Sequence, residues 1–428
     1  MEREEKYLAF KNADEANNHG LIVNQFKEVA AIMEEPKLTE GFREGYLTNL
    51  LTHATRHSAF YKPYESFKSI QDFPLVNKEI LKEHWDEVLV PEFKGRNDNK
   101  EKRTSGSTGT PFVVLWDRRK HSRMIADIKY FARMGGCESH ERIVCMVVND
   151  KVIPPKDKME RDNVYTIQCG FFDDASIEKM LSEVEFYNPK MIIAYSSMWD
   201  AIANYIYDGK AREYKLKLSS IMAEAEGLKE RTRKILEEFF HCPVYSRYGN
   251  EECGTMAQED GSGYGHRVDN ASYYIEVLDL EKDEPAKEGE IGRVVITDLF
   301  NYAFPLIRYE NGDLAVRRKL EDGREYLSSV VGRKVDMLYT TDGRMVNWLQ
   351  ALIFMKRFMD IRQFQIIQET ETKFTWVLNT ENHEYEDIIV KESKEVFGED
   401  SEYEFKYVNE IPKLRSGKTQ MTICKLNK

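Results

Sequence analysis

The sequence contains two short and wholly apolar runs, Ile143-Val144-Cys145-Met146-Val147-Val148 and Met191-Ile192-Ile193-Ala194. Both have the length of a β-strand, and strands without a polar face are typical of a parallel sheet that is covered on both sides. Between them, apolar residues recur at helical spacing from Ile177 to Val184, behind Ser176 as a candidate helix cap. This alternation of strands and helices predicts an α/β fold with a largely buried sheet.

The same alternation continues to about residue 300. Apolar residues between Leu228 and Phe239 predict another helix at the same spacing. Two further strands are expected at Tyr273–Leu278 and Val294–Thr297, on either side of a charged turn at 281–290. We therefore expect one large domain over this part of the chain.

The C-terminal part of the chain has a different texture. Short strand-like segments follow one another at 364–367, 374–378 and 403–407. We therefore predict two domains, an N-terminal domain of β-sheets flanked by helices over 1–332 and a small α+β domain over 333–428.

The composition is that of a globular protein and excludes several functions. The 428 residues are 41% hydrophobic and 32% charged, and the formal net charge of −12 disfavours binding to a nucleic-acid backbone. No run reaches the roughly 18 apolar residues that a membrane span needs, and the acidic start lacks the pattern of a secretory signal. The six cysteines show no paired spacing. We expect a cytoplasmic protein that binds no nucleic acid and has no membrane span.

A dense cluster of hydroxyl residues and glycines stands at Arg103-Thr104-Ser105-Gly106-Ser107-Thr108-Gly109-Thr110-Pro111. Such a loop can point successive backbone N–H groups and hydroxyls into one concavity, which is a way to bind polyphosphate. It is not a Walker A loop, because no lysine follows the second glycine. An ordinary flexible turn is an alternative that the composition leaves open.

A second string lies close to the end of the chain, Ile411-Pro412-Lys413-Leu414-Arg415-Ser416-Gly417-Lys418-Thr419. Gly417-Lys418-Thr419 imitates the end of a Walker A loop. However, Pro412 stands where the leading glycine would be, and only residues 420–428 follow, so a P-loop phosphotransferase is nearly excluded. A solvated basic turn is the alternative to a functional lysine.

Three more segments complete an ordered series, at 246–254 (Ser-Arg-Tyr-Gly-Asn-Glu-Glu-Cys-Gly), 305–313 (Pro-Leu-Ile-Arg-Tyr-Glu-Asn-Gly-Asp) and 332–338 (Gly-Arg-Lys-Val-Asp-Met-Leu). With the two loops above, the series resembles the motifs of the adenylate-forming ligases, the superfamily of acyl-CoA synthetases. The nearest resemblance is to the phenylacetate–CoA ligase branch, including its relatives associated with capsular polysaccharide biosynthesis. It covers roughly residues 60 to 428, and five motifs in one order are more specific than any one of them.

The resemblance implies how the protein would hold the phosphates of ATP. Glu252 would help to hold Mg²⁺, and Lys418 would be a mobile catalytic lysine on the small C-terminal domain. The residues that would wrap the β- and γ-phosphates are Ser105, Gly106, Ser107, Thr108, Gly109 and Thr110. These roles suit the chemistry, because a carboxylate and an ATP phosphate can react only where positive charge offsets their repulsion.

The resemblance also implies the site of the nucleoside. Tyr248 with Gly249 would lie near the adenine, Asp313 would bind the ribose hydroxyls, and Arg333 would contact ribose or phosphate. For each of them a structural role is the alternative, as a buried tyrosine in the core or an aspartate in a turn.

The implied activity is that of an AMP-forming acid–CoA ligase, with ATP, Mg²⁺ and coenzyme A as cofactors and a small carboxylic acid, aromatic or aryl-acetic, as substrate. After adenylation, the small domain would rotate about a hinge at Val335 and Asp336 and open a path for the thiol of CoA. The residues that match the acid pocket of the family loosely are Tyr195, Ser196, Glu226, Gly227 and Tyr245. A homodimer stays open as the oligomeric state.

Two departures from the family pattern keep alternatives open. Glu251 stands where the family has Thr or Ser, and Val335 stands where it usually has Asp or Lys. They allow a non-catalytic, nucleotide-binding relative. A second alternative keeps the activation step but gives the acyl group to a glycan or amine in surface polysaccharide assembly. Zinc is not expected, because Cys253 and His266 find no third ligand at structural spacing.

Overall fold

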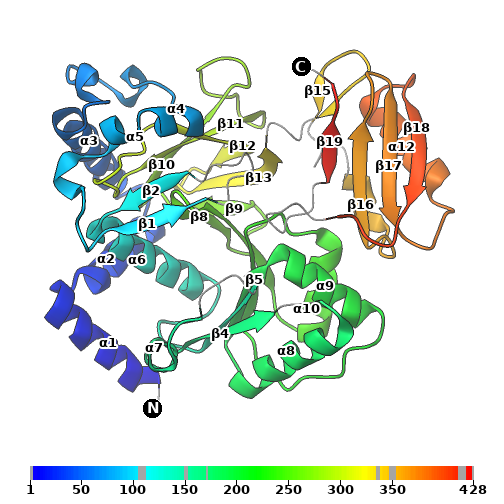
Figure 1. The fold of residues 1–428 in the computed structure, drawn as a ribbon, viewed down its shortest axis with the longest axis horizontal. Coiled ribbons are helices and arrows are strands. Elements are labelled where there is room, and N and C mark those ends of the chain that lie inside the picture. The colour runs from blue at the N-terminus through cyan, green and yellow to red at the C-terminus, as the bar shows by residue number, and fades with distance from the viewer. Residues whose placement is uncertain are drawn as a thin grey trace. The chain divides into compact units, whose positions relative to one another are not determined.

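The computed structural model describes residues 3–104, 112–148, 153–169, 172–333, 338–346, 353–412 and 421–426. The chain divides into two compact units, Met1–Leu228 with Ile235–Val330, and Lys229–Lys234 with Val331–Lys428. Figure 1 shows the helices and strands of both units. The assignment of separate functions to residues 1–332 and 333–428 stays a prediction.

The first unit contains most of the helices and the largest sheet. Its helices are α1 (Arg3–Asn18), α2 (Leu21–Glu34), α3 (Glu40–His57), α4 (Lys78–Glu83), α5 (Trp85–Val88), α6 (Arg118–Met134), α7 (Lys156–Asp162), α8 (Asp174–Tyr187), α9 (Ser196–Tyr207) and most of α10 (Glu230–Phe240), with short 3₁₀ turns at Lys62–Tyr64, Ile70–Asp72 and Pro91–Phe93. Its strands are β1 (Lys100–Arg103), β2 (Val113–Trp116), β3 (Ile143–Val148), β4 (Val164–Cys169), β5 (Met191–Tyr195), β6 (Ser220–Glu224), β7 (Val244–Asn250), β8 (Gly254–Glu259), β9 (His266–Val268), β10 (Tyr273–Leu278), β11 (Ile291–Asp298), β12 (Tyr309–Lys319) and β13 (Glu325–Arg333), the last of which continues into the second unit.

Eleven strands form one sheet in the order β10-β11-β12-β13-β9-β8-β7-β6-β5-β3-β4. Strands β4, β3, β5, β6 and β7 run parallel, whereas β7 pairs antiparallel with β8. The sheet therefore changes from parallel to antiparallel pairing at β7. In α/β proteins, ligands bind beyond the carboxyl ends of parallel strands at such topological changes.

The apolar runs form strands where the sequence predicts them: β5 is buried on both faces, whereas β3 alternates buried and half-buried residues. β3 covers the predicted run, and β5 extends one residue further to Tyr195. Met191 and Ile193 pack with Ala132 of α6 in one cluster, while α8 and α9 lie against the same set of strands in Figure 1. The predicted α/β class with a buried sheet is confirmed.

The helix α8 begins earlier than the sequence suggests. Its buried residues are the expected ones, Ile177, Met180, Leu181 and Val184. The cap, however, is Asp173, whose Oδ1 accepts a hydrogen bond from the backbone N–H of Ser176 at 2.9 Å. The prediction of Ser176 as the cap is wrong, because a carboxylate stands three residues earlier and satisfies the free N–H groups of the first turn.

The second unit is a small α+β structure, as expected. Its four-stranded sheet has the order β18-β17-β16-β19, and a two-stranded sheet pairs β14 with β15. The elements are β14 (Leu338–Tyr339), β15 (Met345–Val346), a 3₁₀ turn at Ile353–Arg357, β16 (Gln363–Gln368), β17 (Lys373–Asn379), α12 (Glu386–Phe397), β18 (Glu402–Tyr407) and β19 (Thr422–Cys424). Trp376, Ile389 and Phe397 are buried in it, so this unit has an apolar core of its own.

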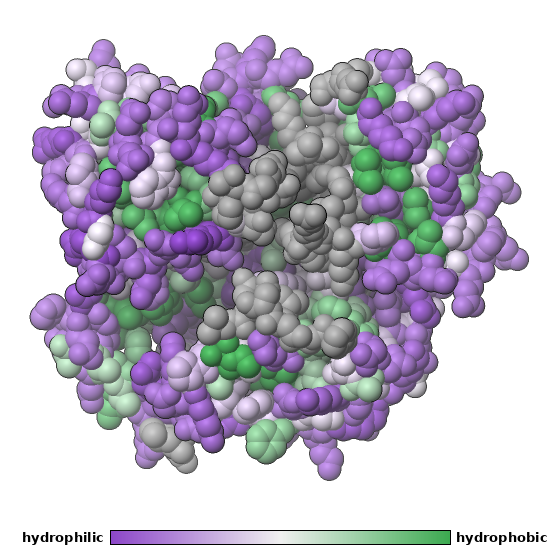
Figure 2. Space-filling model, viewed as in Figure 1, coloured by the Kyte–Doolittle hydropathy of each residue, from purple (hydrophilic) through white to green (hydrophobic). Residues whose placement is uncertain are grey.

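The face drawn in Figure 2 is mostly hydrophilic. No helix among the residues described is long and apolar enough to cross a membrane. The cysteines are all in the described part of the chain, and none of them forms a disulfide there.

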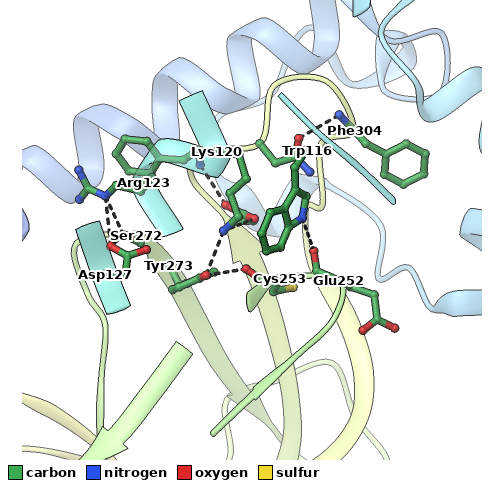
Figure 3. A network of polar contacts seen from close by, with 12 residues as sticks. Trp116, Lys120, Arg123, Asp127, Glu252, Cys253, Ser272, Tyr273 and Phe304 are labelled. Atoms are coloured by element: carbon green, nitrogen blue, oxygen red, sulfur yellow. Dashed lines mark hydrogen bonds and ion pairs between the residues drawn. The ribbon is translucent and has the colours of Figure 1, made fainter. Parts of the chain in front are cut away.

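Helix α6 carries charged side chains into the core of the first unit (Figure 3). Lys120, Arg123 and Asp127 of this helix are fully buried. Burial raises the pKa of Asp127 well above its ordinary value, and the charge of Asp269 raises it further. Asp127 Oδ2 and Asp269 Oδ2 are both buried, and neither has a hydrogen-bond partner among the described residues. A single shared proton satisfies both oxygens, so we infer that the folded protein holds one proton here.

We expect this proton to make stability fall as the pH rises. Both folded-state pKa values lie above the ordinary aspartate value of 3.8, so the stabilisation is present at low pH and is lost as the pH rises through the folded-state values. Asp127→Asn supplies a permanent N–H donor to Asp269 and should reduce this loss, measured by urea unfolding between about pH 5 and pH 8.

A control with the opposite sign is available in Asp72. Backbone hydrogen bonds from Lys68 and Ser69 lower the pKa of its exposed carboxyl, so its stabilisation is lost as the pH falls. Asp72→Asn should leave the loss at high pH unchanged. An Asp127→Asn protein that loses as much stability between the two pH values as the wild type would contradict the shared proton.

Candidate active site

The serine-rich loop is closed at its base by two hydrogen bonds. β1 and β2 form an antiparallel pair, and the loop connects them. The N–H of Thr104 donates to the carbonyl of Phe112 at 3.0 Å, and the N–H of Phe112 donates to Thr104 Oγ1 at 3.2 Å. Residues 105–111, which include the predicted phosphate-binding residues, lie outside the described residues. The structure therefore locates the loop by its two ends.

A lysine that the sequence analysis missed lies at the base of this loop. The Nζ of Lys78 donates a hydrogen bond to Thr104 Oγ1 at 2.7 Å. Lys78 opens α4, which Asn77 caps by accepting from the N–H of Ile80 at 2.9 Å. Just before it, Val76 forms a parallel β-bridge with Tyr309, the first residue of β12. This bridge places Lys78 between the loop and β12, although the residues are distant in sequence.

Glu252 is the carboxylate beside this lysine. It is 8% exposed, and Tyr309 donates a hydrogen bond from its hydroxyl to Glu252 Oε1 at 3.3 Å. Burial raises the pKa of the Glu252 carboxyl, and the positive charge of Lys78 opposes this shift. Thr104, Lys78, Tyr309 and Glu252 therefore form one cluster, with the ends of the serine-rich loop on one side and a buried carboxylate on the other.

The cluster suits a metal ion that arrives with a nucleotide. In the described part of the chain, no group of three or more His, Cys, Asp or Glu residues could hold a metal ion by itself. Mg²⁺ in nucleotide sites is typically held by one or two carboxylates, by phosphate oxygens and by water. Glu252 provides one such carboxylate next to the ends of the loop, so these residues fit Mg²⁺ bound to ATP.

Tyr248, Asn311 and Asp313 form a second cluster. Tyr248 donates a hydrogen bond from its hydroxyl to Asp313 Oδ2 at 2.8 Å, and Asn311 Nδ2 donates to both groups at 2.7 Å. Burial and the charge of Asp313 raise the pKa of Tyr248 far above its ordinary value, so the hydroxyl keeps its proton. The structure thus brings together the predicted adenine and ribose residues, and it adds Asn311 as the group that connects them.

Gly249 has a structural reason to be glycine. A Cβ at this position would lie 2.5 Å from the carbonyl oxygen of Gly254, because β7 and β8 approach closely at a register shift between Tyr248 and Gly249. Glu251, which departs from the family pattern, is exposed on the turn that follows.

Three predicted residues of the acid pocket lie together at the carboxyl ends of β5 and β6. Ser196 Oγ donates to the carbonyl of Glu226 at 2.8 Å, and the N–H of Ser197 donates to Glu226 Oε2 at 3.0 Å. Tyr195 directly precedes this contact, at the end of β5. The carboxylate of Glu226 thus satisfies a free N–H at the start of α9.

The other two predicted pocket residues do not share these contacts. Gly227 is exposed, with open space where a Cβ would stand. Tyr245 packs against the apolar cluster beneath the strand ends, and its hydroxyl points toward Gly261.

An ion pair between a buried arginine and a half-buried glutamate lies beside Tyr195 in the sheet, and the sequence analysis did not predict it. Tyr195 is in register with Glu224 of β6, and Arg247 Nη1 of β7 lies 3.5 Å from Glu224 Oε2. The guanidinium also donates from Nε and Nη2 to Gln258 Oε1 at 3.1 and 3.0 Å. Arg247 lies within the motif 246–254, which drew attention to this segment. The sequence alone, however, could not show that its side chain is buried.

Several predicted site residues cannot be placed. Lys418, the hinge residues Val335 and Asp336, and the loop residues 105–110 lie outside the described residues. Arg333 ends β13, and its backbone alone is described. Their roles stay predictions.

The chain is similar in sequence to known proteins. Residues 338–425 match the model of the CapK C-terminal domain family. Protein CapK of Staphylococcus aureus is 24% identical over 376 residues, which are 83% of this chain and 80% of that protein. Phenylacetate-coenzyme A ligase of Thermus thermophilus is 26% identical over 168 residues, or 38% of each chain.

Solved structures share the fold. A 2-hydroxyisobutyryl-CoA ligase in complex with an acyl adenylate superposes with a TM-score of 0.71 at 16% identity, over 89% of this chain and 88% of that one. An anthranilate CoA ligase in complex with anthranoyl-AMP gives a TM-score of 0.54 at 15% identity, over 76% of this chain and 65% of that one. These similarities support the resemblance to the adenylate-forming superfamily. They also support the resemblance to the branch that contains phenylacetate–CoA ligase and CapK.

We expect Asn311→Ala to weaken the binding of ATP and AMP alike. The substitution removes the amide that joins Tyr248 to Asp313, and a loss of about 1.4 kcal/mol would correspond to roughly 10-fold weaker binding. Isothermal titration calorimetry with each nucleotide measures the effect, and Asn379→Ala in the second unit serves as the control. Unchanged affinity for both nucleotides would show that this cluster is only structural.

We expect Lys78→Met to change the affinity for ATP but not the affinity for AMP. Because Lys78 lies at the base of the predicted β- and γ-phosphate loop, we expect roughly 10-fold or greater weakening for ATP and little change for AMP. The control is Lys82→Met, one turn further along α4. Equal weakening of ATP and AMP binding would show that Lys78 does not act on the β- and γ-phosphates.

Proposed function

We propose that the protein is an AMP-forming ligase that activates a carboxylic acid with ATP and transfers the acyl group to the thiol of CoA. The observation that carries this proposal is the cluster of Thr104, Lys78, Tyr309 and Glu252, which joins the ends of a phosphate-type loop to a buried carboxylate. The family of the chain supports the same activity. The second cluster, around Asp313, offers the place for the nucleoside.

The first step joins the acid to AMP and releases pyrophosphate. Thr104 and Phe112 hold the ends of the loop that would wrap the phosphates, and Lys78 adds positive charge at its base. Mg²⁺, when bound with ATP, supplies further positive charge where the phosphates crowd. Asp313, held by Tyr248 and Asn311, would accept hydrogen bonds from the ribose, and Lys418 would stabilise the charge that develops at the α-phosphate.

In the second step, the thiolate of CoA attacks the acyl carbon and AMP leaves. We assign the lysine of the first step to a lid, residues 333–428, that moves about Val335 and Asp336 between the steps. A single lysine can then act in adenylation and be absent from thioester formation.

The identity of the acid substrate is less well defined than the reaction. An aromatic or aryl-acetic acid follows from the family resemblance, with Tyr195 and Ser196 at the mouth of the pocket. The ion pair of Glu224 and Arg247 beside Tyr195 adds a polar surface that an unsubstituted aryl ring would leave unmatched. A panel of test acids should therefore contain hydroxy and amino acids beside aryl-acetic acids.

A second candidate function changes only the acceptor. The similarity to protein CapK over 83% of the chain supports an activating enzyme of surface polysaccharide assembly, in which a glycan or an amine receives the acyl group. Product analysis with and without CoA separates the two, because both functions share the first step.

The deciding experiment is the exchange of labelled pyrophosphate into ATP in the presence of the acid panel. We expect exchange with at least one acid, and we expect Lys418→Ala to lower it by roughly 100-fold, since one electrostatic contact of a transition state contributes about 3 kcal/mol. The matched control is Lys425→Ala, which removes a lysine that pairs on the surface with Glu369.

Two results would contradict the proposal. A Lys418→Ala protein that exchanges pyrophosphate at the wild-type rate would remove the lid lysine from the mechanism. No exchange with any acid, while ATP still binds, would favour a non-catalytic nucleotide-binding relative.

A further inference from the structure

We propose that Trp116 and Tyr273 are positioning residues for Glu252. They bond to the backbone carbonyls of Glu252 and of the following residue. This fixes the orientation of the Glu252 carboxylate toward the metal of the bound nucleotide. The inference rests on the proposed function, because Glu252 is the predicted metal carboxylate.

The turn between β7 and β8 is fixed at three backbone groups. The indole N–H of Trp116 donates to the carbonyl of Glu252 at 2.8 Å, and the hydroxyl of Tyr273 donates to the carbonyl of Cys253 at 2.6 Å. The N–H of Cys253 donates to Asn250 Oδ1 at 2.7 Å. Figure 3 shows the indole of Trp116 reaching Glu252 and the phenol of Tyr273 reaching Cys253. The peptide planes on both sides of Cys253 are thus set by side chains of distant segments.

The charged side chains of Lys120 and Asp298 orient the hydroxyl of Tyr273. Lys120 Nζ donates to the Tyr273 oxygen at 2.9 Å and lies 2.7 Å from Asp298 Oδ2. Lys120 and Asp298 have side chains that are 0% exposed. Because the lysine occupies the acceptor side of the phenol oxygen, the phenol proton is left for the carbonyl of Cys253.

Apart from its own backbone N–H and the charge of Lys78, the carboxylate of Glu252 has little other support among the contacts described. Its hydrogen bond from Tyr309 is long, at 3.3 Å, and a glutamate side chain has several rotatable bonds. Its direction therefore depends on where the backbone of the turn is held. Gly254 closes the same turn with φ +93°, and a Cβ there would lie 3.3 Å from the Trp116 ring and 3.5 Å from the Tyr273 hydroxyl. The two aromatic side chains fit the turn closely.

Stability alone is the competing explanation, and a matched tyrosine separates the two. Tyr61 is also fully buried, and its hydroxyl donates to a backbone carbonyl, that of Pro305, at 3.2 Å. Tyr273→Phe and Tyr61→Phe each remove one buried phenol hydroxyl that bonds to a carbonyl. Both substitutions should lower the thermal unfolding temperature, but only Tyr273 contacts the turn that carries Glu252.

The test measures the binding of Mn²⁺–ATP to the full chain by electron paramagnetic resonance of the metal, beside thermal unfolding. We expect Tyr273→Phe to weaken the binding of Mn²⁺–ATP by roughly 10-fold, as is typical for residues that orient a metal ligand, and Tyr61→Phe to leave it unchanged. Trp116→Phe, which removes the N–H and keeps an aromatic ring, should act in the same direction and replaces Tyr273→Phe if that variant does not fold.

Glu252→Gln distinguishes the failure of this inference from that of the proposed function. If Glu252→Gln weakens the binding of Mn²⁺–ATP while Tyr273→Phe and Trp116→Phe do not, the positioning role is overturned and Glu252 keeps its own role. If Glu252→Gln leaves the binding unchanged, or the wild type binds no Mn²⁺–ATP, the metal role in the proposed function fails, and this inference fails with it.

Discussion

The buried ion pair between Lys120 of α6 and Asp298 of β11 is the interaction on which the active-site side of the first unit depends. Both side chains are excluded from water, so loss of either partner would leave an uncompensated charge, which typically costs about 3–5 kcal/mol. The pair fixes α6 against the antiparallel part of the sheet. Through Tyr273 it also extends to the turn that carries Glu252, so the same charges serve the packing of the fold and the position of this turn.

A second constraint brings the N-terminal segment to the candidate active site. Val76 bonds to the backbone on both sides of Tyr309, through its N–H to Arg308 and its carbonyl to Glu310. Backbone pairing of this kind fixes position to within a fraction of a residue, which side-chain contacts alone do not. The loop base, Lys78 and Glu252 therefore share one location, because a single bridge ties the chain before α4 to the start of β12.

The sequence predicted the architecture well and the site in part, for physical reasons. Apolar runs without a polar face, such as 143–148 and 191–194, report burial directly, and the strands formed there. Tyr248 and Asp313 came from motifs, and they do share a cluster. Lys78, Trp116 and Tyr273 could not be predicted, because their roles come from tertiary contacts between distant segments. Asp173 was missed as the cap of α8 because Ser176 also has the right chemistry, and only backbone geometry decides between two candidates three residues apart.

The contacts of the turn from Asn250 to Gly254 constrain its length as well as the identity of its residues. Three backbone anchors and a close approach at Gly249 leave no room for an inserted or deleted residue. Glu251, by contrast, faces solvent, so its side chain can change without disturbing the anchors. In evolution, such a position can alter the electric field around a nucleotide while the frame that aims the neighbouring carboxylate stays the same. A substitution at this one exposed position is thus expected to change the charge of the turn and to leave its shape unchanged.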